Sequence, residues 1–124
     1  MYDARLLGLW RSDAKRTWRE VAARRDIPTR NVNTLRRLFG TLELRYTRTR
    51  CYATLKGHTD VFPYTVAAKD SSSVAIVSCD PIAGQVISHL HYEGSYMWVS
   101  VGTGQFREFF KRARRSTRAA KKRR

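Results

Sequence analysis

The chain has 124 residues, 42% of them hydrophobic, and a formal net charge of +15 at pH 7. This length and composition are typical of one globular domain. No segment approaches the roughly 18 consecutive apolar residues of a membrane-spanning helix. We therefore predict a single domain with a terminal tail, and the composition excludes a helical membrane protein.

The N-terminus has no basic segment followed by an apolar stretch and a cleavage site, which predicts a cytoplasmic protein. In that compartment the two cysteines, Cys51 and Cys79, are expected to stay reduced. Neither cysteine lies in a Cys-x-x-Cys or Cys/His cluster, so the sequence predicts no zinc site. We predict no cofactor.

The first forty residues read as one strand and two helices. "ARLLGLW" is short and apolar, as a strand requires, and Ser12 or Asp13 can cap a following helix. The helical pair is predicted over about 13–39, with Pro28 and Thr29 between the helices and Gly40 as the stop. The first helix is expected to bury a stripe of four residues: Ala14, Trp18, Val21 and Ala22.

From Thr41 onward, turn signals recur about every ten residues, as in an all-β barrel, sandwich or meander. Seven candidate strands follow one another, and Pro63 within the third predicts an edge strand or a bulge. The predicted fold class is α+β and mostly β: an antiparallel meander or small barrel of about eight strands with a two-helix insertion after the first strand. The candidate strands are "TLELRYT", "CYATLKG", "VFPYTVAAKD", "SVAIVSC", "QVISHLHYEG", "SYMWVSVG" and "GQFREFF".

Several short segments carry a family resemblance: "GLWRSD" at residues 8–13, Lys69-Asp70, Asp80-Pro81 and the stretch from His89 to Val99. Over about residues 6–112 the chain resembles the lipocalin and fatty-acid-binding superfamily, and most closely small uncharacterised bacterial lipocalin-like proteins. The resemblance implies a non-enzymatic barrel in which an early Trp closes one end under a basic residue of the last strand. Gly8, Trp10 and Arg107 match that structural signature.

The resemblance also implies a site for a small hydrophobic ligand inside the barrel. An eight-stranded barrel of short strands is either filled by its own side chains or holds one small ligand, and the sequence leaves both alternatives open. The candidate interior residues are the large aromatic ones: Tyr46, Phe62, Tyr64, Trp98 and Phe106.

The positive charge is concentrated at the two ends of the chain. Residues 1–40 carry a net +6, residues 41–110 are neutral, and residues 111–124 carry nine cations without an acid. Such a segment predicts a disordered tail that binds a polyanion, either non-specific nucleic acid or an anionic membrane surface. The candidate polyanion-binding residues are Arg30, Arg36, Arg37, Lys111, Arg112, Arg114, Arg115, Arg118, Lys121, Lys122, Arg123 and Arg124. A tail boundary is expected after residue 110.

Residues 21–37 offer an alternative function. They are similar to a helix-turn-helix, and that reading predicts a nucleic-acid-binding protein that uses this pair together with the tail. Asp26 stands where that motif usually has Gly, and seven strands follow where a winged helix has two or three.

His89 and His91 lie two residues apart on a predicted strand, so they share one face and are candidate metal ligands. Because Leu90 and Tyr92 occupy the opposite face, the alternative is that both histidines lie on the outside of the sheet. The sequence contains no Gly-x-Ser-x-Gly and no phosphate loop. We therefore predict that the protein is not an enzyme.

Overall fold

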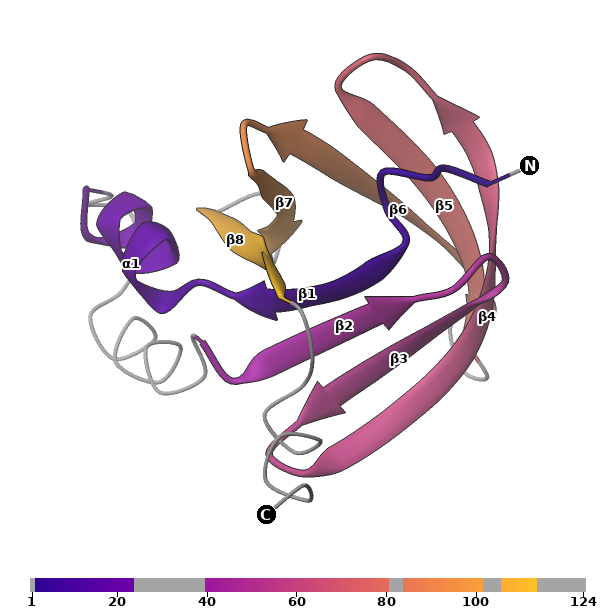
Figure 1. Ribbon diagram of the computed structural model, residues 1–124, viewed down its shortest axis with the longest axis horizontal. Coiled ribbons are helices and arrows are strands. Elements are labelled where there is room, and N and C mark those ends of the chain that lie inside the picture. The colour runs from indigo at the N-terminus through magenta and orange to yellow at the C-terminus, as the bar shows by residue number, and fades with distance from the viewer. Residues whose placement is uncertain (1, 24–39, 81–83, 102–105, 114–124) are drawn as a thin grey trace.

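A computed structural model describes residues 2–23, 40–80, 84–101 and 106–113. Within them, eight strands form a closed antiparallel barrel in sequence order, with β8 pairing back to β1 (Figure 1). The predicted fold class is confirmed, including seven strands after residue 40. The elements are β1 (Gly8–Ser12), α1 (Ala14–Ala23), β2 (Leu42–Tyr46), β3 (Arg50–Leu55), β4 (His58–Lys69), β5 (Ser73–Asp80), β6 (Gly84–Glu93), β7 (Tyr96–Val101) and β8 (Phe106–Ala113).

The turn between β3 and β4 shows why the meander folds back so tightly. Only Lys56 and Gly57 separate the two strands, and both have positive φ, 51° and 83°. Two successive residues in this region make the hairpin turn whose twist matches that of the flanking strands. Glycine adopts the conformation without strain.

Pro63 does not make β4 an edge strand. β4 pairs with β3 up to Pro63, and its ladder with β5 begins at Tyr64. Proline therefore lies where the strand passes from one neighbour to the next, so its missing N–H interrupts neither ladder in the middle. The irregularity in β4 lies further on, between Val66 and Ala68.

Helix α1 begins as predicted, because the Asp13 carboxylate accepts a hydrogen bond from the Arg16 N–H at 3.0 Å. Its buried face differs from the expected stripe: Thr17 and Val21 are buried, whereas Ala14 and Ala22 are exposed. A hydrogen bond determines which face of α1 is buried: the Thr17 hydroxyl accepts the Phe109 N–H at 2.9 Å and so fixes α1 on β8. The predicted second helix lies outside the described residues. None of the described helical segments is long and apolar enough to cross a bilayer.

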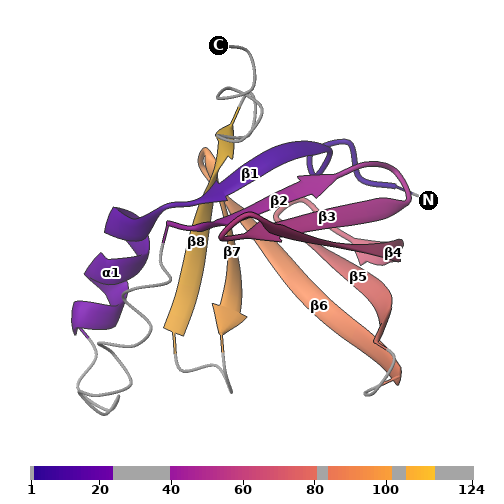
Figure 2. The same cartoon turned by 90° about the horizontal axis from the view of Figure 1, so that it is seen from below.

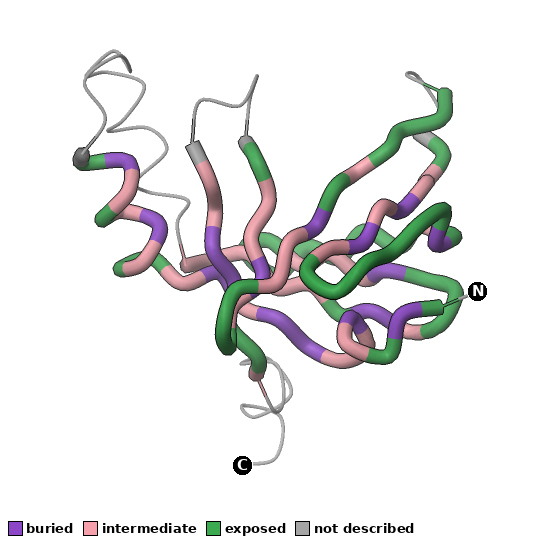
Figure 3. The backbone as a smooth tube through the Cα atoms, turned by 90° about the horizontal axis from the view of Figure 1, so that it is seen from above, coloured by how far each residue is buried: buried purple, intermediate pink, exposed green. Residues whose placement is uncertain are grey.

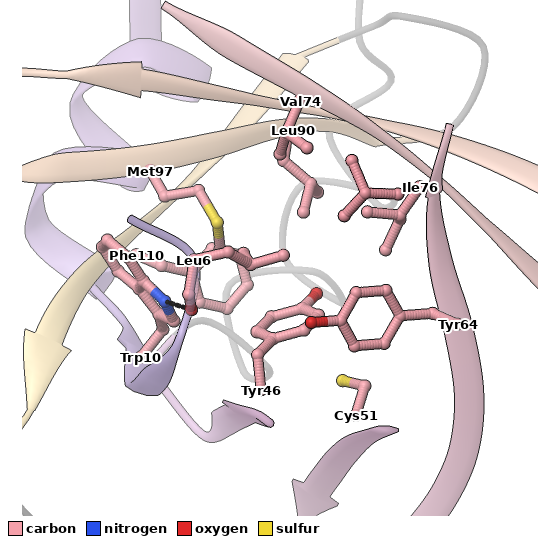
Figure 4. Close-up of a cluster of buried hydrophobic side chains, with 11 residues drawn as sticks. Leu6, Trp10, Tyr46, Cys51, Tyr64, Val74, Ile76, Leu90, Met97 and Phe110 are labelled. Carbon is pink, nitrogen blue, oxygen red and sulfur yellow. Dashed lines mark hydrogen bonds between the residues drawn. The ribbon is translucent and has the colours of Figure 1, made fainter. Parts of the chain in front are cut away.

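Residues 2–7 cross one end of the barrel, called here the closed end. Leu6 is fully buried there beside Trp10, whose indole N–H donates to the Leu6 carbonyl at 2.9 Å (Figure 4). Arg5 donates to the Asp3 carboxylate at 2.7 Å and to the Ser71 carbonyl at 2.9 Å. These bonds join the N-terminal segment to the turn between β4 and β5.

The barrel core follows the alternation of the strands. One group of interior side chains lies at the closed end, and a second group lies deeper around Tyr46 and Tyr64, whose rings meet edge to face at 5.5 Å (Figure 4). The buried core residues are Leu6, Trp10, Tyr46, Cys51, Tyr64, Val66, Val74, Ile76, Leu90, Met97 and Phe110. Both cysteines are free, Cys51 buried and Cys79 exposed.

Candidate functional site

The opposite end of the barrel, called here the mouth, contains two adjoining cavities. The mouth cavity has a volume of about 520 Å³ and the side cavity about 440 Å³. They share Phe62 and Ser78, so the Phe62 ring stands at the boundary between them. Ala53, Asp60, Val61, Phe62, Ser78, Cys79 and Val86 line the mouth cavity; Tyr46, Phe62, Ile76, Ser78, Ile87, Ser88, His89, Leu90, Val99 and Ser100 line the side cavity.

The side cavity lies where β6 leaves β7. β6 pairs with β5 over eight residues but with β7 over only three, from His91↔Trp98 to the turn. Toward the mouth the two strands diverge, as Figure 2 shows. The cavity lining includes Ser88 and Leu90 from β6 together with Val99 and Ser100 from β7. In the part of the chain that the structure describes, the barrel is therefore open at the side as well as at its end.

Apolar side chains are exposed around the mouth. Val61 on β4 is 52% exposed and Ile87 on β6 is 63% exposed. Figure 3 shows the same contrast along the chain: buried segments gather toward the closed end, and the ends of β5 and β6 beside residues 81–83 are exposed. Apolar surface around a concave opening is typical of ligand entrances and interaction sites.

Polar groups in the deeper part of the barrel are hydroxyls and a thiol. Burial raises the pKa of the Tyr46 hydroxyl well above its ordinary value, and burial raises that of the Cys51 thiol to about 11. The Tyr64 hydroxyl donates to the Thr47 carbonyl at the closed-end side of the core. Because the pKa values of Tyr46, Cys51 and Tyr64 are raised, these three side chains are neutral at physiological pH and contribute no charge to the interior.

Glu108 lies on the wall of the barrel formed by β8, and the Ser12 hydroxyl donates to its carboxylate at 2.7 Å. Ser12 in turn accepts the Gly40 N–H at 3.1 Å. Burial raises the pKa of Glu108, while the Ser12 hydrogen bond lowers it and offsets part of that effect. This chain of bonds joins β8, β1 and the start of β2.

The predicted signature at the closed end is right in its glycine and tryptophan but wrong in its arginine. Arg112, not Arg107, lies over the Trp10 ring, with its guanidinium carbon 4.1 Å from the ring centroid. Trp10 and Arg112 are paired in the β1–β8 register. Gly8 has φ +113°, and a Cβ there would lie 2.9 Å from the Arg112 guanidinium, so only glycine fits without displacing it.

Arg107 lies on the outer face of β8. Alternation along a strand reverses the face at each residue, so five positions place Arg107 and Arg112 on opposite faces. The Arg107 guanidinium donates to the Glu20 carboxylate of α1 at 2.8 Å and lies 4.9 Å from the Trp98 ring. Its hydrogen bond lowers the pKa of Glu20, against the smaller opposing effect of burial. Arg107 therefore holds α1 to the barrel.

Three of the predicted interior residues lie as expected. Tyr46, Phe62 and Tyr64 belong to the barrel core or pack against it. Trp98 is a correction: because Met97 and Val99 point inward on β7, Trp98 points outward, where its ring stacks on His91 with centroids 4.0 Å apart. The side chain of Phe106 lies outside the described part of the chain.

His91 lies on the outer side of β6, as the alternative interpretation had it, with its ring stacked on Trp98. His89 lines the side cavity beside the opening between β6 and β7, and His58 on β4 contacts Asp60 at 3.1 Å. Within the described ranges, no group of three His, Cys, Asp or Glu side chains is arranged to hold a metal ion.

Of the predicted polyanion-binding residues, two are described. Lys111 is exposed on β8, but Arg112 is engaged by Trp10 and by the carbonyls of Arg5 and Leu7. β8 continues to Ala113, so the first three residues of the predicted tail belong to the barrel. The others lie outside the described residues: Arg30, Arg36, Arg37, Arg114, Arg115, Arg118, Lys121, Lys122, Arg123 and Arg124.

The sequence interpretation missed Ser78, Ser88 and Asp60. The two serines have a readable signal, since Ser78 continues the inward series Val74 and Ile76, and Ser88 shares its face with Leu90. Asp60 shares its face of β4 with Phe62 and Tyr64 in the same way. Small polar residues in an inward series leave space that larger side chains would fill.

Fold and site together define an eight-stranded antiparallel β-barrel closed at one end and hollow at the other. No family model, no curated protein and no solved structure matches this chain.

Proposed function

We propose that this protein is a non-enzymatic, lipocalin-like binding module whose barrel takes up one small, mostly apolar molecule at the mouth. The observation that carries the proposal is the pair of cavities, about 520 and 440 Å³, that meet at Phe62. Ligand sites usually have volumes of about 300–1,000 Å³ and mostly apolar linings with a few polar groups. Phe62, Ile76 and Leu90 supply the apolar walls, and serine hydroxyls supply the polar groups.

Entry between β6 and β7 supports the same function. The two strands share only three paired positions, so few backbone hydrogen bonds hold that part of the wall. Segments with few such bonds open at low free-energy cost. Binding then orders the mouth, and the closed end, with its buried side chains and hydrogen bonds, stays fixed.

The test is a substitution, Ser78→Phe, that fills the space where the two cavities meet. Titration of the full chain with the uncharged dye Nile red should give a saturable rise in fluorescence, and Ser78→Phe should weaken its binding at least tenfold, on the order of 1.4 kcal/mol. The matched control is Thr65→Phe, which adds the same ring to an exposed position of β4 one residue from the partner of Ser78. Equal affinities for the two variants would contradict the proposal.

A second candidate function rests on charge. Nine cations without an acid in residues 111–124 favour a polyanion, and nucleic acid is the partner we propose. The test compares the full chain with a chain that ends at Ala113, which retains all of β8. Loss of duplex and single-stranded DNA binding on truncation, with a steep decrease of the full chain's affinity between about 50 and 200 mM salt, is the expected result.

A further inference from the structure

The two cavities contain no positively charged side chain among the residues described as lining them. No Arg or Lys of the described ranges contributes to either wall, although the chain as a whole carries +15. The described lining includes one carboxylate, Asp60 at the mouth, and one imidazole, His89 beside the opening between β6 and β7. The protein as a whole is strongly basic, whereas the described lining of its cavities contains no basic Arg or Lys side chain.

Described arginines near the barrel are held elsewhere. Arg107 binds Glu20 on the outside of β8, and Arg45 lies over the Tyr52 ring with its guanidinium carbon 4.0 Å from the centroid. Arg112 caps Trp10 at the closed end. None of these three lines a cavity.

Asp60 is the carboxylate among the residues described as lining the two cavities. It lies across from Ala53 in the β3–β4 register, and both residues line the mouth cavity. Its side chain is 75% exposed, and its nearest described ionic partner is the exposed His58 ring at 3.1 Å. A carboxylate in this position repels an anion at the entrance and attracts a cation, although solvent weakens the effect.

We infer that the molecule bound in the barrel has an uncharged or positively charged polar end, and that the cavities reject amphiphiles with a carboxylate. This inference rests on the proposed binding function and specifies its ligand class. A carboxylate that enters the cavities gives up hydration, and no described lining cation replaces it. A hydroxyl or amine loses less, because Ser78, Ser88 and Asp60 offer hydrogen-bond partners.

The expected orientation follows from the same distribution. The apolar part lies against Phe62, Ile76 and Leu90 in the side cavity. The polar end lies toward Ser78, which lines both cavities, and toward Asp60, which lines the mouth cavity.

The experiment compares three ten-carbon probes that differ only in their polar end: 1-decanol, decylamine and decanoate. Each is titrated into the full chain by isothermal calorimetry at about pH 7 and about 0.3 M salt, which shortens the screening length to several Å and suppresses attraction of decanoate to the basic tail. Decanol and decylamine should bind with one site, and decanoate should bind at least tenfold more weakly. Ser78→Phe should abolish the binding of the first two.

The outcomes separate this inference from the function on which it rests. If decanoate binds as tightly as decanol and Ser78→Phe removes both, the barrel is a carrier but the inference about charge is wrong. If none of the three probes and no Nile red binds, the proposed function itself fails.

A second comparison isolates Asp60. Asp60→Asn and Glu93→Gln each remove one negative charge, but Glu93 lies at the β6–β7 turn of the closed end, outside the cavity linings. Asp60→Asn should weaken decylamine binding about threefold, and Glu93→Gln should leave it unchanged. Asp60→Lys should raise the affinity for decanoate. Equal effects of the Asn and Gln variants would show that Asp60 does not face the ligand, which overturns its assigned role.

Discussion

The closed end and the mouth of this barrel are built from the same eight strands but differ in how far their side chains are buried and hydrogen-bonded. At the closed end, residues 2–7 bury Leu6, and the Asp3 carboxylate accepts hydrogen bonds from Arg5 and from the Tyr92 hydroxyl. At the mouth, β6 and β7 diverge, and Val61 and Ile87 are exposed. Buried side chains and their hydrogen bonds gather at the closed end, and under the proposed function the mouth is the end that holds the ligand.

The largest expected effect is at Trp10. Trp10→Ala removes a buried indole, its hydrogen bond to the Leu6 carbonyl and the ring beneath Arg112, and should lower the free energy of unfolding by about 3–5 kcal/mol. Urea denaturation measures it. Trp98→Ala is the control on the outside of the barrel, where the ring is partly exposed. An equal loss for both variants would show that the buried Trp10 ring contributes no more to stability than a ring on the outside of the barrel.

The next largest change in stability is expected from Asp3 at the closed end, compared with Asp60 at the mouth. Burial alone raises the pKa of Asp3, but the hydrogen bonds and charge of Arg5 and the Tyr92 hydroxyl outweigh it, so the pKa is lowered overall. Asp3→Ala leaves those donors without their acceptor and should cost about 1–3 kcal/mol. Asp60→Ala at the mouth should change stability little, because it removes an exposed contact. Chemical denaturation of both variants at neutral pH decides whether this ordering holds.

The sequence was sufficient for the strands because alternation and turn residues are local signals. "TLELRYT" alternates clearly, and Gly57 marks the turn between β3 and β4, although β4 begins at His58 and not at Val61 as the candidate strand did. The faces of β7 were harder to predict. Tyr96 and Trp98 are as large and apolar as Met97 and Val99, so the pattern does not say which pair points inward. The β8 partners decide it, since Met97 lies across from the core residue Phe110.

The cavities could not be predicted from local pattern. β6 keeps its alternation through the segment where it no longer pairs with β7, so the end of the ladder leaves no mark in the sequence. The face of α1 was missed for a related reason: the contact that positions it is a hydroxyl on a backbone N–H, which hydrophobic periodicity does not detect.

A smaller effect compares two carboxylates on opposite sides of β8. The Arg107 hydrogen bond lowers the folded-state pKa of Glu20, so its contribution to stability is present above the unfolded pKa and is lost as the pH falls through the folded pKa. Burial raises the folded-state pKa of Glu108, so its favourable contribution is present below the unfolded pKa and is lost as the pH rises through the folded pKa.

Glu20→Gln should therefore destabilise the protein near pH 7 and lose that effect in acid, whereas Glu108→Gln should stabilise it near pH 7 and have little effect at about pH 3. Urea unfolding curves at a series of pH values give both differences. If both substitutions change the free energy of unfolding in the same direction near pH 7, then it is wrong that Glu20 is an ion-paired carboxylate and Glu108 a desolvated one.

The smallest stability change is expected at Ile87. Because its side chain is 63% exposed, Ile87→Ser should alter the free energy of unfolding by no more than about 0.5 kcal/mol. The same substitution removes apolar surface from the lining of the side cavity and should weaken Nile red binding several-fold.

The control is Val77→Ser, at the cross-strand partner of Ile87 on β5, which is partly buried and outside both cavity linings. Val77→Ser should cost more stability and less affinity than Ile87→Ser. The reverse order would mean that the exposed apolar residues of the mouth serve the fold, and the division between a stable end and a binding end would then be wrong.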